Sequence, residues 1–291
     1  MPQTISKIYK TLVFDDAVSL AVLDTTALVN EAIRRHQLSP VAAAALGRTL
    51  TATAYLASWL KDGESSLSVS VNGGGAGGKI GAAADGALNV RGFIEHPDVM
   101  LPPRADGKLD VGSCVGKRGT LTVIRDDGAG IPFVGTSELV SGEIAEDFSA
   151  YFLTSEQRPT AIALGVKIAP DGVCAGAGGV ILQPLPGADE ETLSRTERAI
   201  GAYSAISSVI EREGAERVLR DFGAENADVR DVLFRCHCSR ERAASAILAM
   251  GRAEAESILR EEGKIAVHCH YCNTDHTFYE EDVARLFGEN P

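Results

Sequence analysis

The sequence predicts an α+β protein in three parts: an N-terminal antiparallel-sheet domain with helices (residues 1–183), a charged helical linker (184–231) and a small cysteine-rich C-terminal domain (232–291). Three observations lead to this division. Apolar and polar residues alternate over several short segments of the first part, which is typical of strands. Charged residues then become much more frequent, and four of the six cysteines lie in the last part.

The N-terminal part begins with segments that favour a hairpin and two helices. Asp15 and Asp16 lie between two alternating apolar runs, where a hairpin turn is expected. Ser39 is a good N-cap and is followed by Pro40, a residue favoured at the first helical position. The expected elements are a hairpin over residues 11–23, a helix over 24–36 and an alanine- and leucine-rich helix over 40–60.

From Ser65 onward the pattern changes to short alternating runs separated by glycine-rich turns. This pattern predicts an antiparallel meander, with one further helix before its last two strands. The final run, rich in glycine, is expected to close the sheet. The expected strands cover residues 65–71, 80–84, 88–94, 109–115, 120–124, 160–168 and 174–182, and the expected helix covers 141–152.

Residues 189–231 form a charged, amphipathic segment. Of these 43 residues 17 are charged and none is lysine. Such helices cannot form a core alone, so we expect their apolar face to pack on the preceding domain; an ordinary solvated helical pair is the alternative. The apolar residues at roughly helical spacing are Leu193, Ile200, Ile206, Val209, Ile210, Val218 and Leu219.

The C-terminal part holds two close pairs of cysteines. Cys236 and Cys238 are separated by one residue, and Cys269 and Cys272 by two. Two thiol pairs on separate turns can supply four tetrahedral ligands to one Zn²⁺ ion. Helices are expected at 240–248, 253–261 and 280–287. The alternatives are buried apolar cysteines, structural disulfides, or a mixed site that uses one of the histidines at positions 237, 268, 270 and 276.

A zinc ion held by four thiolates has no open position for water, so this site is not expected to be hydrolytic. Structural zinc contributes about 10–16 kcal/mol of apparent binding energy, whereas a domain is stable by about 5–15 kcal/mol. Oxidation of the ligands should therefore unfold the small domain. Nearby cationic residues either tune the reactivity of the thiolates or are ordinary surface charges; they are Arg235, Arg240, Arg242 and Lys264.

Two other motifs have ordinary structural explanations. Residues 73–79 (GGGAGGK) match a phosphate-binding loop, but Ile80 replaces the required Ser or Thr and a strand pattern follows. A hairpin turn explains this run better. Cys114 and Cys174 are isolated cysteines with no histidine nearby in the sequence, so we expect buried apolar residues rather than nucleophiles.

Composition excludes several classes of protein. Apolar residues make up 45% of the chain, which is enough to bury a core. The net charge of −12 and the 5% aromatic content argue against binding to nucleic acids or anionic membranes. No run approaches the roughly 18 apolar residues of a membrane-spanning helix. Residues 1–4 lack the pattern of a secretion signal, so a cytoplasmic location is expected.

Taken together, the motifs resemble those of the heat-shock protein 33 family, a family of redox-regulated chaperones. The cysteine tail carries much of the resemblance, which extends over nearly the whole chain. Further matching segments occur in the family's order: residues 89–93 (NVRGF), 140–147 (VSGEIAED), 151–160 (YFLTSEQRPT), 177–183 (AGGVILQ) and 234–239 (FRCHCS).

This resemblance implies an ATP-independent holdase that binds unfolding proteins and is inactive when reduced and loaded with one Zn²⁺ on the four cysteines. It implies that hypochlorous acid, or peroxide with heat, forms the disulfides Cys236–Cys238 and Cys269–Cys272 and releases the zinc. The zinc domain and linker then unfold, and the active form is a homodimer. Clients pass to ATP-dependent refolding chaperones downstream.

The amphipathic pattern adds a hypothesis about client binding. Apolar linker residues would meet unfolded proteins once the linker opens, while its acidic residues keep the complex soluble. The candidates are Leu193, Ile206, Ile210, Val218 and Leu219. The rival hypotheses are a small-ligand enzyme with a purely structural zinc site and a zinc-ribbon nucleic-acid binder.

Overall fold

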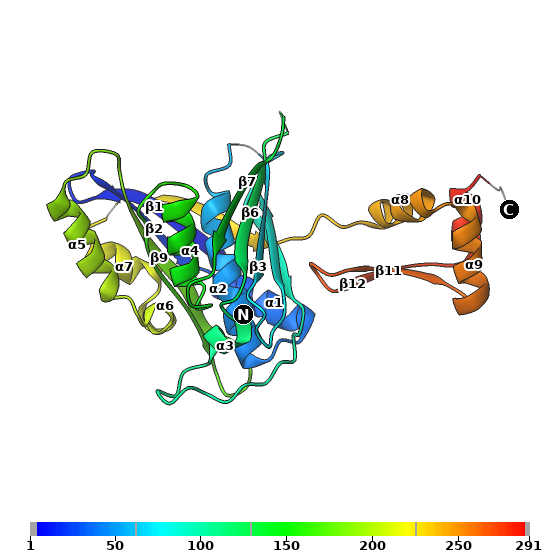
Figure 1. Ribbon diagram of the computed structural model, residues 1–291, viewed down its shortest axis with the longest axis horizontal. Helices are drawn as coiled ribbons and strands as arrows, with labels where there is room; N and C mark the ends of the chain where they lie inside the picture. Colours follow the sequence, from blue (N-terminus) through cyan, green and yellow to red (C-terminus); the bar gives the residue numbers. More distant parts are fainter. Residues whose placement is uncertain (1–4, 62, 129, 225, 289–291) are drawn as a thin grey trace. The chain divides into compact units, whose positions relative to one another are not determined.

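The structure is a computed structural model that describes residues 5–61, 63–128, 130–224 and 226–288. It divides into two compact units, residues 1–235 and 236–291 (Figure 1). Residues 1–4, on which the expected lack of a secretion signal rests, lie outside the described residues, as do 289–291. Within the described ranges, no helix is long and apolar enough to span a membrane.

The first unit is built on a sheet that has ten strands within the described residues, in the order β7-β6-β3-β4-β5-β10-β1-β2-β9-β8. All neighbours are antiparallel except β5 and β10. The expected α+β class is thus confirmed. The strands are β1 (Ser6–Val13), β2 (Val18–Asp24), β3 (Ser66–Asn72), β4 (Ile80–Asp85), β5 (Asn89–Ile94), β6 (Thr120–Asp126), β7 (Phe133–Glu138), β8 (Ala161–Ile168), β9 (Cys174–Pro184) and β10 (Asp228–Phe234).

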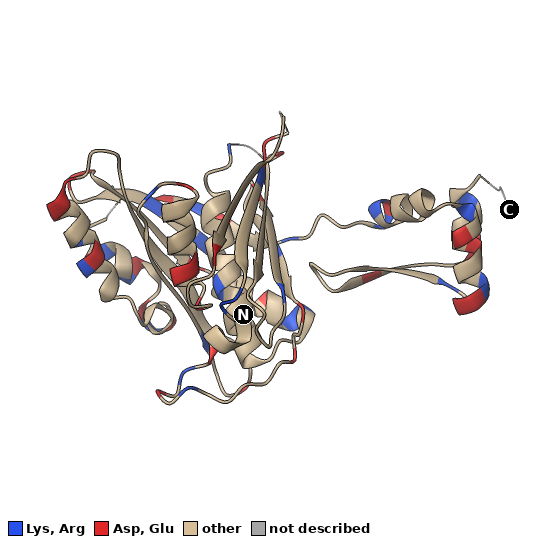
Figure 2. Ribbon diagram, viewed as in Figure 1, with Lys and Arg blue, Asp and Glu red and all other residues tan. Residues whose placement is uncertain are grey.

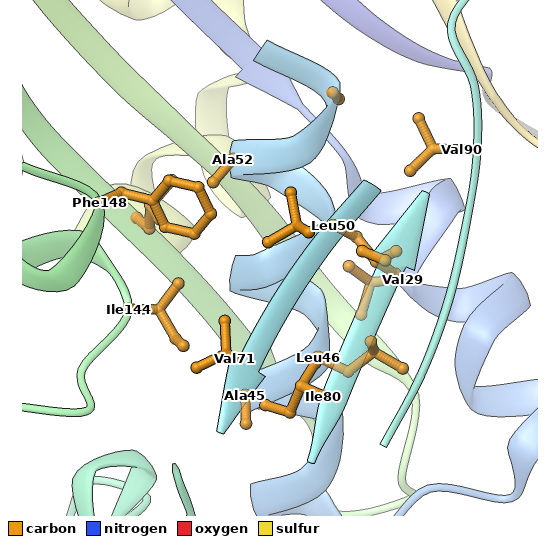
Figure 3. Close-up of a cluster of buried hydrophobic side chains, with 14 of the residues drawn as sticks. Val29, Ala45, Leu46, Leu50, Ala52, Val71, Ile80, Val90, Ile144 and Phe148 are labelled. Atoms are coloured by element: carbon orange, nitrogen blue, oxygen red, sulfur yellow. The ribbon is translucent and has the colours of Figure 1, made fainter. Parts of the chain in front are cut away.

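The helices of the first unit form around a central, almost wholly buried helix, α2. As predicted, it begins at Pro40, and the Ser39 hydroxyl accepts a hydrogen bond from the Ala42 N–H at 3.3 Å. Its Leu46 and Leu50 meet apolar residues of the sheet and of α4 (Figure 3). The helices are α1 (Thr26–His36), α2 (Pro40–Ala57), α3 (Val111–Val115), α4 (Ala145–Thr154), α5 (Glu190–Gly201), α6 (Ile206–Glu213) and α7 (Ala215–Asp221).

The linker segment packs on the face of the sheet opposite α2. Ile206, Ile210 and Val218 are buried there against Leu20 and Leu182. The expected amphipathic helices are therefore present as α5, α6 and α7, and their apolar side covers the preceding domain as predicted. The last part of the expected helical segment, residues 228–231, instead belongs to strand β10, which pairs with β1. Figure 2 shows acidic and basic residues along α5 and α7. The division at residues 183/184 and 231/232 stays a prediction.

Three features of the sheet and its connections differ from what the sequence predicts. Residues 109–115, expected as a strand, contain the short helix α3, because the Asp110 carboxylate caps it by accepting from the Ser113 N–H at 3.0 Å. Strand β7 was not predicted, because its buried positions hold Gly135 and Ser137 while Phe133 and Val134 are exposed, so that its apolar residues do not alternate. The final run, β9, does not close the sheet, since β8 is the outermost strand.

The helix expected from Ser141 begins four residues later, at Ala145. The reason is Asp147, a fully buried carboxylate. Its oxygens accept hydrogen bonds at 2.8–3.2 Å from four backbone N–H groups, those of Val140, Ser141, Gly142 and Ile144. This one side chain therefore holds residues 140–144 as a loop, because a buried carboxylate needs such donors.

The glycine run forms the predicted hairpin turn between β3 and β4, not a loop that opens a helix. Its backbone lies directly on the end of α3: the N–H groups of Gly75 and Gly77 donate to the carbonyls of Val115 and Cys114. A Cβ at Gly75 would lie 2.4 Å from the nitrogen of Gly116. Glycine is thus required for the close approach of two backbones.

The second unit is small. Within its described residues it contains α8 (Arg240–Met250), α9 (Arg252–Glu262), the hairpin β11 (Ile265–Cys269) and β12 (Thr274–Phe278), and α10 (Glu280–Leu286). All three expected helices are present, and the hairpin is additional. A short apolar cluster that includes Ile247, Ile265, Phe278 and Val283 forms its core. Units with so few buried residues commonly need a metal or a disulfide to stay folded.

The contact at Gly75 gives a test of the fold. The change Gly75→Ala should lower the free energy of unfolding of the first unit by about 1–3 kcal/mol, since two backbone segments must separate. The ring centroid of Trp59, the chain's one tryptophan, lies 5.3 Å from that of Tyr55. Its fluorescence reports the unfolding of this unit in urea titrations. Gly63→Ala is the matched control because nothing lies within 4 Å of the added Cβ. Equal midpoints for the two variants would contradict the packing.

Candidate metal centre

The four clustered cysteines come from two separate turns of the second unit. Cys236 and Cys238 lie in the extended segment before α8, whose N-cap is Ser239. Cys269 ends β11, and Cys272 lies in the turn that leads to β12. In that turn the backbone carbonyl of Cys269 accepts from the N–H groups of Cys272 and Asn273, at 3.3 and 2.8 Å. The hairpin thus bends its two thiols towards one point.

All four Sγ atoms lie within 4.8 Å of one another. The Sγ atoms of Cys236 and Cys269 are 3.7 Å apart, and those of Cys238 and Cys272 are 3.3 Å apart. In a tetrahedral site with zinc–sulfur bonds of about 2.3 Å, the sulfur atoms lie about 3.8 Å apart. The cluster therefore fits a zinc site, and an all-thiol ligand set suits Zn²⁺ better than Mg²⁺ or Ca²⁺.

The pKa values of the metal-free thiols also favour a bound cation at this cluster. Burial raises the pKa of Cys236, and burial together with the crowded neighbouring thiols raises the pKa of Cys238. Although burial opposes it, hydrogen bonding from Thr274 and the other thiols lowers the pKa of Cys272. Four thiolates so close together repel one another, and a divalent cation provides the charge that allows all of them to lose their protons.

Histidines surround the cluster without belonging to it. Within the described residues, the close group of potential ligands consists of the four cysteines. His268 Nδ1 instead lies 2.7 Å from the Asp275 carboxylate, and its ring lies 4.9 Å from that of His270. This arrangement favours the four-thiol interpretation over the mixed Cys/His site.

Two of the nearby arginines have structural contacts. Arg240 pairs with Asp282 at 2.8 Å and donates to the Thr277 carbonyl at 2.6 Å, which ties α8 to the hairpin and to α10. Arg242 donates to the carbonyl of His237 at 3.1 Å, between the first two cysteines. These contacts position the turn that carries Cys236 and Cys238.

The other two cysteines are buried in the first unit, as expected. Cys114 is fully buried in α3 and Cys174 is 2% exposed in β9. Burial raises the pKa of Cys114 to about 11 and that of Cys174 to about 12. Both thiols therefore stay protonated and unreactive at neutral pH.

The candidate client-binding residues are mostly covered in this conformation. Leu193 is 36% exposed, whereas the others are at most 8% exposed: Ile206, Ile210, Val218 and Leu219. All four buried residues belong to the apolar cluster between the linker and the sheet.

Sequence reasoning missed the polar contacts that hold the linker on the sheet. The Tyr9 hydroxyl donates to Glu216 at 3.1 Å, and Lys167 pairs with Glu211 at 2.6 Å. Burial and Glu216 raise the pKa of Tyr9 to about 12, so the hydroxyl remains a donor at neutral pH. No local pattern could reveal these pairs, because their members are 44 to 207 positions apart.

Comparison with known proteins identifies relatives over nearly the whole chain. A family model described as Hsp33 protein matches residues 6–279. The "33 kDa chaperonin" of Bacillus cytotoxicus is 43% identical over 282 residues, covering 95% of this chain and 97% of that protein. The protein of the same name from Bacillus subtilis is 38% identical, covering 95% and 96%. The crystal structure of the 33 kDa chaperonin (heat shock protein 33 homolog) of Thermotoga maritima matches with a TM-score of 0.89 and 34% identity, covering 97% and 98% of the two chains.

The ligand assignment can be tested by single substitutions. If four thiolates share about 10–16 kcal/mol of zinc binding, loss of one, as in Cys238→Ser, should weaken zinc affinity by more than about a hundredfold. The measurement is competition for zinc with a chromogenic chelator, and Cys114→Ala is the control because that thiol is distant in sequence and buried in α3. Stoichiometric, tight zinc in all four single variants would refute the assignment.

Proposed function

Because the chain belongs to the Hsp33 family and is therefore a chaperone, we propose that it is an ATP-independent holdase that oxidation activates. The observation that carries the proposal is the cluster of four thiols in a unit with a very small apolar core. Such a unit depends on its metal, and its metal depends on the oxidation state of the thiols. The same atoms thus serve as structural ligands and as the sensor.

In the reduced state, Cys236, Cys238, Cys269 and Cys272 hold one Zn²⁺. The bound ion supplies the positive charge that the four thiolates require and joins two turns that lie 30 residues apart in the sequence. The turns hold α8 and the β11–β12 hairpin around the small core. The holdase is inactive in this state, because the docked linker covers the sheet and buries the linker's own apolar residues.

Activation requires a two-electron oxidant such as hypochlorous acid, or peroxide with heat. Two thiolates lose two electrons and form one S–S bond, while hypochlorous acid takes up both electrons and leaves as chloride and hydroxide. Two such reactions form the disulfides Cys236–Cys238 and Cys269–Cys272, as the family resemblance implies. The cluster then has no thiolates left to bind zinc, and the second unit loses the energy that kept it folded.

Unfolding of the second unit reaches the linker through the chain itself. Cys236 follows β10 after a single residue, and β10 is the strand that joins β1 to β5. Only two residue pairs connect β10 to β5, whereas five connect it to β1. The linker helices before β10 are held by one apolar cluster and a few polar contacts. We propose that residues 184–231 open as the second step.

Opening of the linker would expose the client-binding residues. Ile206, Ile210, Val218 and Leu219 would then join Leu193 at the surface, together with the apolar sheet face that they covered. Unfolded proteins expose apolar side chains that bind such surfaces. The acidic residues of α5 and α7 would keep the complex in solution (Figure 2).

The other parts of the proposal concern partners and location. We propose that the oxidised form is a homodimer in the cytoplasm and passes its clients to ATP-dependent refolding chaperones. The net charge of −12 disfavours nucleic acid and anionic membranes as partners. The enzyme alternative places a small ligand in the glycine-rich N-terminal domain, where the glycine run 73–79 is a hairpin turn packed on α3.

Light scattering from a thermally aggregating client tests the function. The oxidised, zinc-released protein should suppress aggregation at near-stoichiometric ratios without ATP, whereas the reduced, zinc-loaded protein should not. Reduction with added zinc should restore the inactive state. Suppression by both forms would remove the switch from the proposal, and suppression by neither, with zinc loss confirmed, would refute the holdase.

Hydrogen exchange tests the linker step. On oxidation, the amides of α5, α6 and α7 should lose protection, because their support is one apolar cluster and a few polar contacts. Helix α2, which is buried on all sides, is the internal control and should stay protected. Unchanged exchange in the three linker helices, with zinc released, would contradict linker opening.

A further inference from the structure

Strand β8 leaves one edge of the large sheet unpaired. It pairs with β9 on one side and is the last strand on the other. Beyond that pairing, residues 161–168 make no backbone–backbone hydrogen bond within the described part of the chain. Alternate N–H and C=O groups of such a strand point outward, ready to pair with another extended chain.

A groove of about 680 Å³ runs along this edge and is lined by residues 162–168 of β8. One wall comes from the core, with Arg48 of α2 and Glu146 of α4. The opposite wall comes from the linker, with Ile200, Ser204, Ala205, Ser207 and Ser208. The edge of the sheet therefore lies between two layers, and one of these layers is the segment proposed to move.

The side chains along β8 suit an apolar neighbour. Leu164 and Val166 lie on the core side of the strand and are 8% and 9% exposed. On the linker side, Gly165 allows the backbone of α6 to approach, since a Cβ there would lie 2.9 Å from the Ser207 nitrogen. The Lys167–Glu211 ion pair ties α6 to the same strand. The linker is thus in direct contact with the face of β8, beside its unpaired edge.

We propose that the β8 edge binds an extended segment of an unfolding client as an additional strand of the sheet. This inference rests on the proposed holdase function and specifies how the client is recognised. Backbone N–H and C=O groups are common to all polypeptides, so pairing with them requires no sequence motif. A folded protein has already paired these groups, and only an unfolding one offers them.

The proposed opening of the linker would control access to this edge. With the linker docked, Ser204, Ala205, Ser207 and Ser208 form one wall of the groove. Release of the linker would remove that wall and leave the edge open. The opposite edge strand, β7, lies at the other end of the strand order from β8 and β9, on which the linker packs. Its Phe133 and Val134 are 45% and 58% exposed in the present conformation. The β7 edge therefore serves as the matched control.

Site-specific cross-linking locates the client. In the full-length protein, the photo-crosslinking residue benzoylphenylalanine replaces either Lys108, an exposed residue on the rim of the groove, or Val134 on β7. A thermally unfolding client should cross-link at position 108 in the oxidised form, at least about fivefold more than in the reduced form, and more than at position 134. Cross-links at position 134 alone, or none at 108 while aggregation is still suppressed, would overturn the groove without affecting the holdase function.

N-methylated peptides test the mode of binding. Two versions of a fluorescent peptide of alternating valine and threonine carry N-methyl groups on either the odd or the even residues. An added strand pairs through one of its edges, so one version should bind the oxidised protein about tenfold more weakly and the other should not. Equal binding of both versions would exclude strand addition. Selective weakening without suppression of aggregation would instead refute the holdase and leave the peptide site standing.

Discussion

Four thiolates at this distance repel one another, so a bound cation would hold them together, and the small second unit would depend on that cation to stay folded. Cys236 and Cys238 precede α8, while Cys269 and Cys272 belong to a hairpin that follows α9. Between these turns the unit buries only a short apolar cluster. In the proposed function, the charge of a divalent ion would carry the stability that a larger core would otherwise provide. Oxidation of the thiols would then become a folding event, because the stabilising energy of the unit would be concentrated at the cluster.

In the proposed function the linker would be coupled to this event, because its helices have little support of their own. One side of α5, α6 and α7 is apolar and packs on β1, β2, β8 and β9, and the other side is charged and faces water. Helices of this kind are stable only while their apolar side has a partner. Their C-terminal anchor is β10, which lies between the two halves of the sheet and leads directly into Cys236. The first two cysteines of the cluster and the linker thus lie on one continuous stretch of chain.

Local patterns predicted most of the elements and brought the four cysteines into one site, since capping at Ser39, strand alternation and paired thiols are all short-range signals. They failed where distant residues decide the conformation. Asp147 delays the start of α4 by binding four N–H groups of the preceding loop. The sequence alone predicts that β10 is the end of a charged helical segment. Only its pairing with β1 and β5 makes it a central strand. The contacts Tyr9–Glu216 and Lys167–Glu211 join residues that lie too far apart in the sequence for any local pattern to relate them.

The close fit between α6 and the sheet explains why linker docking should be all-or-none. Glycines at positions 165 and 176 allow the helix to lie almost on the backbone of β8 and β9: a Cβ at Gly176 would lie 2.3 Å from the Ser207 carbonyl oxygen. Dispersion attraction falls steeply once such surfaces separate by even half an ångström. A helix in this position is therefore either fully docked or released, with few stable positions between. Release would uncover the apolar face and the β8 edge at the same time, so that one transition would make both side-chain and backbone binding available to an unfolding protein.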